Sequence, residues 1–225
     1  MSERSDIIVI LDRSGSMQTR RADHEGGLRS FLADAQRLAG DVRLTFVRFD
    51  SHDPCEVVLD AVPVADIRPD MLTLIPRGGT PLLDAVGETL TRYAAKCGEA
   101  TTVVIITDGE ENESRSWKKG AVQDLIKARE AAGWRVLYLG ANVDAFAEAG
   151  ALGVSRATTL DFANTRGGTA SAYHLLSQNV SQSYSARSAG ASWLAARQNL
   201  NFTDSQRKAA REDDDDPTAK TGVSQ

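Results

Sequence analysis

The sequence predicts an α/β fold: a doubly wound, mostly parallel, Rossmann-like sheet with helices on both faces and one antiparallel edge strand. Short apolar runs alternate with stretches of helical periodicity, which is typical of parallel strands joined by crossover helices. The run Val103–Ile106 is apolar at successive positions, as expected of a central strand covered on both faces. Only residues 50–55 separate the second and third apolar runs. This connection is too short for a parallel crossover, so the two runs are expected to form a hairpin at a sheet edge.

Five apolar runs have the length and composition of buried strands, and a sixth run is weaker. They cover residues 7–11, 42–49, 56–59, 102–107 and 135–139, and the weaker run covers 158–160. Five segments between or after these strands have helical periodicity: 23–39, 81–96, 116–132, 143–149 and 168–185. In the first of these, Leu28, Phe31, Leu32, Ala35 and Leu38 fall on one helix face. In the second, Pro81 stands in the first turn, where proline is favourable.

The C-terminal quarter differs in composition from the rest of the chain. We expect residues 1–165 to form the domain core, and residues 166–203 to form a helical segment whose first helix packs on that core. Thr203 and Gln206 have the spacing of a capping box. Residues 204–225 are therefore expected to form a short helix followed by a disordered tail that contains the acidic run 212–216.

Composition places the chain among ordinary globular proteins. Of its 225 residues, 41% are hydrophobic and 25% are charged, with a net charge of -5. The acidic balance gives no reason to expect bulk binding to nucleic acid or to an anionic membrane. The first apolar run is too short for a signal-peptide core, and no stretch approaches transmembrane length. Cys55 and Cys97 match no metal-binding spacing and no disulfide framework. We therefore expect a cytoplasmic, soluble protein.

Three short fragments, distant in sequence, carry oxygen ligands at the ends of apolar runs. They are Asp12-Arg13-Ser14-Gly15-Ser16, Gly78-Gly79-Thr80 and Thr107-Asp108-Gly109. In a doubly wound sheet such fragments open onto one crevice beyond the carboxyl ends of the strands. In an extended loop, alternate residues share a face, so Asp12, Ser14 and Ser16 are expected to line one wall of a cation site. Two carboxylates supply a charge of about -2, which leaves a divalent cation electrophilic towards a further anionic ligand.

Taken together, these fragments resemble the metal-ion-dependent adhesion site (MIDAS) of von Willebrand factor A (VWA) domains. The family pattern is Asp-x-Ser-x-Ser, then a distant Thr, then a distant Asp. The resemblance covers roughly residues 6–162 and implies that Asp12, Ser14, Ser16, Thr80 and Asp108 bind the metal. It implies Mg²⁺ as the ion, with Mn²⁺ or Ca²⁺ as alternative occupants. The chain looks most like the small intracellular members of bacterial or phage type.

An enzymatic function is not expected. The chain has no Gly-x-Ser-x-Gly elbow, and the loop has Ser14 where a haloacid-dehalogenase-type phosphatase would need a second Asp. His24, His52 and His174 are expected in or beside surface elements, although His24 precedes a helix near the metal loop. A metal-dependent hydrolase remains an alternative, but the sequence offers no clearly positioned general base.

The predicted function is a Mg²⁺-dependent protein-interaction module, used as an intracellular adaptor or assembly factor. A partner's Asp or Glu would complete the metal's ligands, and Arg13 and Arg77 are expected to contact that partner. A second alternative is a structural subunit that assembles with itself and holds a mainly stabilising metal. The acidic tail raises the related possibility that one of its carboxylates occupies the metal site of the same or a neighbouring molecule.

Overall fold

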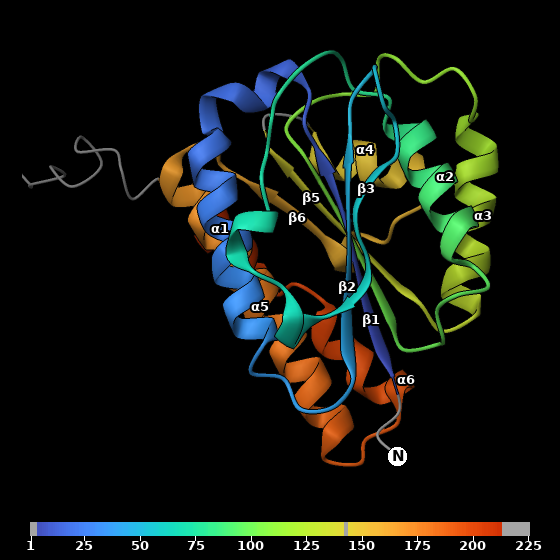
Figure 1. Ribbon diagram of the computed structural model, residues 1–225, viewed down its shortest axis with the longest axis vertical. Helices are drawn as coiled ribbons and strands as arrows, with labels where there is room; N and C mark the ends of the chain where they lie inside the picture. Colours follow the sequence, from blue (N-terminus) through green and yellow to red (C-terminus); the bar gives the residue numbers. More distant parts are fainter. Residues whose placement is uncertain (1–3, 142–143, 213–225) are drawn as a thin grey trace, which may run out of the picture.

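The computed structural model describes residues 4–141 and 144–212, and it confirms the predicted fold class. Six strands form one sheet in the order β3-β2-β1-β4-β5-β6 (Figure 1). All neighbouring strands are parallel except β2 and β3, which form the expected antiparallel hairpin at one edge. The strands are β1 (Ser5–Asp12), β2 (Val42–Phe49), β3 (Glu56–Pro63), β4 (Thr101–Thr107), β5 (Arg135–Ala141) and β6 (Thr159–Phe162).

Helices cover both faces of the sheet, and each face has its own hydrophobic core (Figure 1). The helices are α1 (Arg21–Ala35), α2 (Leu82–Tyr93), α3 (Lys119–Ala131), α4 (Ala145–Leu152), α5 (Arg166–Ser188), α6 (Trp193–Ala196) and α7 (Asp204–Arg211). Side chains of α1, α5, α6 and α7 join one core, and side chains of α2, α3 and α4 join the other. The side chains of β1 alternate between the two cores, Ile7 and Val9 facing one and Ile8 and Ile10 the other.

The last long helix, α5, covers the segment in which a helix was expected and packs lengthwise on α1 (Figure 1). This close approach depends on Gly27, because a Cβ atom there would lie 2.2 Å from Cδ2 of Tyr173. The predicted capping box is present at the start of α7, where the Thr203 and Gln206 side chains and backbones pair reciprocally. The acidic run begins at Glu212, and its remaining residues lie outside the described part of the chain.

The strand order places the switch point of the sheet between β1 and β4. The two strands are parallel neighbours whose carboxyl ends reach the same edge, with Leu11 opposite Ile106. The connection after β1 crosses to one face of the sheet and the connection after β4 to the other, which opens a crevice at this edge. Asp12 ends β1 and Asp108 directly follows β4. The fold therefore brings two of the three oxygen-rich fragments together before any loop detail is considered.

Candidate metal centre

Asp12 is the last residue of β1 and is fully buried. Its Oδ2 accepts a hydrogen bond of 2.6 Å from the Thr107 hydroxyl, which belongs to the last residue of β4. Its Oδ1 accepts a hydrogen bond of 2.6 Å from the backbone N–H of Ser14. Each carboxylate oxygen is thus oriented by a different chain segment, so the position of Asp12 depends on the β1–β4 pairing and on the loop that follows it.

The serines of the first fragment reach Asp108 through a chain of hydroxyls. The Ser14 and Ser16 hydroxyl oxygens are 3.0 Å apart, and the Ser16 hydroxyl donates to Oδ1 of Asp108 at 2.6 Å. The local geometry differs from the extended loop that we expected. A 3-10 helix, η1 (Gly15–Arg20), begins directly after Ser14, so Ser16 meets the site from a helical turn. The expectation of three alternate residues on one extended wall is therefore wrong, although the same three side chains still converge.

Thr80 enters the site from the loop before α2 and is almost completely buried. Its backbone N–H donates to Asn112 Oδ1 at 2.8 Å, and its carbonyl accepts from the Asn112 backbone N–H at 3.1 Å. A Cβ atom on Gly109 would lie 3.1 Å from Thr80 Oγ1 and 3.8 Å from both Asp12 Oδ2 and Ser16 Oγ. Oxygens of Thr80, Asp12 and Ser16 therefore lie around one position beside Gly109, and Ser14 and Asp108 are joined to them through the Ser16 hydroxyl. The structure brings together all five predicted ligands.

The electrostatic environment of the two carboxylates favours a bound cation. Burial raises the pKa of Asp12 to about 6, although hydrogen bonds from Thr107 and Ser14 act in the opposite direction. Burial also raises the pKa of Asp108, against the hydrogen bond from Ser16. Among residues 4–141 and 144–212, no lysine, arginine or histidine forms an ion pair with either carboxylate. The site therefore concentrates negative charge without a protein cation to balance it.

The donor set fits a hard divalent cation. The described residues contain no group of three or more His, Cys, Asp and Glu side chains placed to hold a metal, so a soft-ligand or carboxylate-rich centre is absent from that part of the chain. The candidate centre instead combines two carboxylates with three hydroxyls, which suits the oxygen preference and modest charge demand of Mg²⁺. Ser16 is the one exposed member of the five, so the centre opens to solvent on its side.

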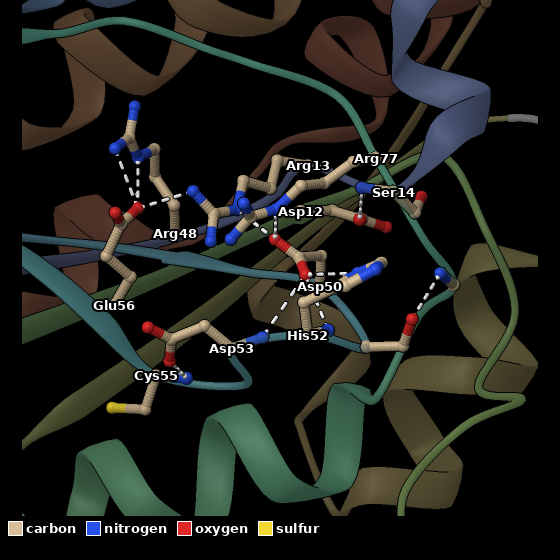
Figure 2. Close-up of polar contacts among 12 residues, drawn as sticks. Asp12, Arg13, Ser14, Arg48, Asp50, His52, Asp53, Cys55, Glu56 and Arg77 are labelled. Carbon is tan, nitrogen blue, oxygen red and sulfur yellow. Dashed lines mark hydrogen bonds and ion pairs between the residues drawn. The ribbon is translucent and has the colours of Figure 1, made fainter.

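Arg13 and Arg77 do not occupy similar positions, and the expectation for Arg13 needs correction. Arg13 is only 2% exposed. Its guanidinium forms ion pairs with Asp50 and Glu56 on the β2–β3 hairpin (Figure 2). A buried, paired guanidinium offers a partner no surface, so Arg13 cannot make the direct contact that we expected. The Arg77 side chain is 48% exposed, and its Nε donates to Asp50 at 3.0 Å.

Several residues that organise the centre were not singled out from the sequence. Thr107 and Asn112 hold Asp12 and Thr80 in place, and Gly109 leaves the space between the ligands. Two acidic residues, Asp84 and Glu111, hold the loop after β4 against α2. Asp84 is buried and accepts backbone N–H groups of Arg115, Ser116 and Trp117, while Glu111 accepts those of Leu83, Glu113 and Ser114. Their proximity to the motifs was the available signal, since an acidic side chain near a helix start can bind free backbone N–H groups.

His24, the histidine expected near the metal loop, is not a surface residue. His24 is buried at the α1–α5 contact, with Nδ1 3.1 Å from the Tyr173 hydroxyl and its ring edge-on to Phe162 and Tyr173. Burial, reinforced by the charge of Arg20, lowers the pKa of His24 to about 4. A histidine held neutral between two helices in this way serves packing and is not exposed to a substrate.

Comparisons with known proteins support the fold. The sequence matches no known family model and no curated protein. Solved structures with the same fold include proximal thread matrix protein 1 from the mussel byssus, at 16% identity over 77% of this chain and 44% of that chain, with a TM-score of 0.58. The von Willebrand factor type A protein from Catenulispora acidiphila is 13% identical over 80% of this chain and 43% of that chain, with a TM-score of 0.58.

A third similar structure is a single domain of nearly the same extent. It is the vWF domain of the type V pili tip protein Mfa5 from Porphyromonas gingivalis, at 11% identity over 80% of this chain and 96% of that chain, with a TM-score of 0.62. The chain thus has the fold of von Willebrand factor A domains, and it spans less than half the length of the mussel and Catenulispora proteins. One structure of the mussel protein, with a TM-score of 0.54, has a zinc-occupied MIDAS motif.

Proposed function

We propose that this domain binds a divalent cation, Mg²⁺ in the cell, and uses it to recognise an acidic residue of a partner protein. The convergence of the five candidate ligands carries this proposal: oxygens of Thr80, Asp12 and Ser16 lie around one position beside Gly109, and Ser14 and Asp108 are joined to them through the Ser16 hydroxyl. Asp12, Ser14, Ser16, Thr80 and Asp108 would hold the cation, with Asp12 or Asp108 binding directly or through water. The bound cation would supply an electrophilic position that a carboxylate can occupy.

The protein's own groups support binding and not chemical turnover. The carboxylate of Asp12 accepts hydrogen bonds from Ser14 and Thr107, and that of Asp108 accepts one from Ser16. His24 is the histidine expected closest to the centre, and it is buried with its Nδ1 against Tyr173. A general base needs a clear path to a substrate proton, and the nearly complete burial of Asp12 and His24 leaves neither of them one. We therefore propose a non-enzymatic function.

The exposed rim suits an acidic partner segment. Ser16 and Arg77 are exposed on the loops that carry the ligands. Arg77 shares Asp50 with Arg13 and retains exposed donor groups. A charge-assisted contact beside a metal-bound carboxylate would add orientation and association rate more than raw affinity. Proteins with a similar fold include a thread matrix protein of the mussel byssus and a pili tip protein, which supports the proposal of a protein-binding role.

We further propose an intracellular adaptor or assembly role for the domain, in the cytoplasm of a bacterial cell or its phage. Among the described residues, no helix has the length and apolarity needed to cross a bilayer. The acidic charge balance is the basis for expecting protein partners and not nucleic acid. The tail that begins at Glu212 would supply carboxylates for self-association, and removal of residues 212–225 tests that contribution through oligomer size with and without Mg²⁺.

The proposal is tested by metal titration of the wild type and of two matched threonine variants. Thr80→Val removes a ligand hydroxyl from a residue that is 2% exposed, and Thr89→Val removes a hydroxyl from a fully buried residue of α2 whose contact is Cys55. Calorimetry should show Mg²⁺ or Mn²⁺ binding to the wild type and to Thr89→Val, with about tenfold or greater weakening in Thr80→Val. Wild-type protein that binds neither ion would contradict the proposal.

Partner binding is tested by a pull-down in Mg²⁺ and in EDTA with the same variants. Capture that is lost in EDTA and with Thr80→Val, but kept with Thr89→Val, supports metal-dependent recognition. Capture that persists in EDTA while chelation lowers the melting temperature supports the structural-subunit alternative. Turnover of phosphate or carboxylate esters that depends on Mg²⁺ and disappears with Thr80→Val supports the hydrolase alternative.

A further inference from the structure

The first ligand fragment contains one residue whose side chain leaves the metal site. Arg13 lies between Asp12 and Ser14 in the sequence, but its guanidinium is directed to the β2–β3 hairpin (Figure 2). It donates through Nε to Asp50 Oδ2 and through Nη1 to Glu56 Oε2. Asp50 is fully buried and follows β2, and Glu56 begins β3. Burial of the Arg13 guanidinium is unfavourable because the charge loses its hydration, unless ion pairs with good geometry compensate for that loss.

Asp50 is the centre of a charged cluster that consists of Arg13, Arg48, Asp50, Glu56 and Arg77. Its Oδ2 also accepts Nε of Arg77 at 3.0 Å, and its Oδ1 accepts the backbone N–H of His52 at 2.6 Å. Burial alone would raise the pKa of Asp50, but the bonds from Arg77 and His52 and the charge of Arg13 outweigh burial and lower it. Asp50 is therefore ionised at neutral pH, and it connects the fragment after β1 with the fragment before Thr80.

The main chain of Arg13 makes the same two connections. Its N–H donates to the Phe49 carbonyl at 3.0 Å, and its carbonyl accepts the N–H of Arg77 at 2.8 Å. Two residues further on, the N–H of Gly15 donates to the Gly78 carbonyl at 3.0 Å. Backbone hydrogen bonds thus join the loop that carries Ser14 and Ser16 both to the loop that carries Thr80 and to the end of β2.

The remaining member of the cluster, Arg48, is bound in a different way. Its Nε donates to Glu56 Oε2 at 2.8 Å, and its Nη1 donates to the Thr73 carbonyl at 2.8 Å. Arg48 is 8% exposed and so nearly as buried as Arg13. It shares Glu56 with Arg13 but has no hydrogen bond or ion pair with Asp50, and its contact with the loop before α2 is at Thr73, seven residues before Thr80. The chain therefore supplies its own comparison residue.

We propose that Arg13, acting through Asp50, is a positioning residue that sets the metal affinity of the centre without contacting the metal. The inference rests on the proposed function, because it concerns the same centre. The Arg13–Asp50 pair fixes the ligand loop on the hairpin, and the shared Asp50–Arg77 contact holds the loop of Thr80 in register with it. Loss of the guanidinium leaves the ligands present but no longer held at one separation, and metal affinity falls because the loops must be ordered on binding.

The test compares Arg13→Met with Arg48→Met as a matched control. Each variant removes one buried guanidinium of the same cluster and leaves all five ligands in place. In calorimetry at 10 °C, Arg13→Met should bind Mn²⁺ about tenfold or more weakly than the wild type, and Arg48→Met within about threefold of it. Melting temperatures in EDTA show how far each variant is destabilised. If the two variants lose similar stability, a difference in their Mn²⁺ affinities reports on the metal centre and not on general destabilisation.

Two further measurements keep the inference open to contradiction. Arg13→Lys keeps the charge but loses the planar fork that reaches two carboxylates, so its Mn²⁺ affinity should lie between those of the wild type and Arg13→Met. The electron paramagnetic resonance spectrum of bound Mn²⁺ should broaden in Arg13→Met and not in Arg48→Met, because only the former disturbs the ligand geometry. If Arg13→Met fails to fold, Asp50→Asn carries the same comparison with the same thresholds.

The outcomes separate this inference from the proposed function. Wild-type protein without Mn²⁺ or Mg²⁺ binding overturns the proposed function and the inference with it. Wild-type binding together with an Arg13→Met affinity within threefold of wild type overturns the positioning role alone. An Arg48→Met affinity that falls as far as that of Arg13→Met also overturns it, because metal affinity would then report only general loosening of the cluster.

Discussion

The two buried carboxylates Asp12 and Asp50 have opposite electrostatic surroundings. Asp12 accepts hydrogen bonds from hydroxyl and backbone groups, has no basic partner among the described residues, and has a raised pKa because it is buried. Asp50 is equally buried, but Arg13 and Arg77 share its Oδ2, and its pKa is lowered. The comparison distinguishes a carboxylate arranged for an incoming cation from one already paired within the protein.

The difference follows from what each side of the loop must do. On the side of Asp50, charges alternate through Arg77, Asp50, Arg13, Glu56 and Arg48, so each buried charge has a partner of opposite sign. On the side of Asp12, the carboxylate accepts hydrogen bonds from the Thr107 hydroxyl and the Ser14 backbone N–H, which orient its oxygens but do not neutralise them. The first arrangement stabilises the fold, and the second leaves free energy that a cation can recover.

The largest effect is expected on metal affinity when the charge of Asp12 is removed. Asp12→Asn keeps the acceptor for Ser14 and lets the Thr107 hydroxyl accept instead of donate, so the fold should tolerate it. Outer-shell changes at metal sites cost about 10–100-fold in affinity, so loss of a charged ligand should cost about 1,000-fold. In EDTA at pH 7.5 the variant should be more stable than the wild type by about 2 kcal/mol, because an ionised carboxylate whose pKa folding raises destabilises the native state above that pKa.

Calorimetry with Mn²⁺ and chemical denaturation in EDTA check the two parts of this prediction. Mg²⁺ at about 100 times its Kd should stabilise the wild type by about 2.7 kcal/mol and leave Asp12→Asn unchanged. If Asp12→Asn is instead less stable than the wild type in EDTA, the prediction is wrong, and Asp12 stabilises the fold in the way that Asp50 does.

The second largest effect is expected on the free energy of unfolding when the charge of Asp50 is removed. Asp50→Asn leaves the guanidinium of Arg13 buried beside a neutral amide, and removal of one member of a buried pair typically costs about 3–5 kcal/mol. We expect the variant to unfold with a free energy about 3 kcal/mol below that of the wild type in EDTA, measured by urea denaturation. The same substitution at Asp34, on an exposed pair with Arg37, is the control and should cost less than about 0.5 kcal/mol.

The third effect concerns the pKa of the buried residue His24, which burial and the charge of Arg20 lower. His24 has its pKa lowered to about 4, so the folded protein binds fewer protons than the unfolded chain between about pH 4 and 6.5, and stability falls as pH falls through that range. His24→Phe keeps an aromatic ring against Phe162 and Tyr173 and cannot be protonated. Between pH 7 and 4.5 the wild type should lose about 2 kcal/mol relative to the variant.

This experiment is best performed in the Asp12→Asn background with EDTA. The raised pKa of Asp12 makes the metal-free wild type more stable as pH falls through the same range, which would oppose the His24 effect. Equal pH dependence of the unfolding free energy with and without His24→Phe would mean that His24 takes up its proton in the folded state without loss of packing.

The fold and the convergence of the five candidate ligands were predictable because both depend on local patterns. Buried strands such as Val103–Ile106 are apolar at successive residues, and ligands such as Asp12 and Asp108 stand at strand ends, where parallel topology brings them together. The role of Arg13 was not predictable, because Asp50 lies 37 residues away in a hairpin that sequence periodicity does not position to within a hydrogen bond. The burial of His24 depends in the same way on Tyr173, which is 149 residues distant.

The smallest expected effect sharpens the comparison by filling the space that a cation would use. Gly109→Ala places a Cβ 3.1 Å from Thr80 Oγ1 and 3.8 Å from Asp12 Oδ2, tight enough to push the ligands apart by a few tenths of an ångström. Mn²⁺ affinity should fall about tenfold, which corresponds to about 1.4 kcal/mol, while stability in EDTA changes by less than about 0.5 kcal/mol. Gly98→Ala is the control, because its Cβ would meet nothing within 4 Å. Wild-type affinity in Gly109→Ala would place the cation elsewhere, and the five oxygens would then be a hydrogen-bonded loop support of the same kind as the Asp50 cluster.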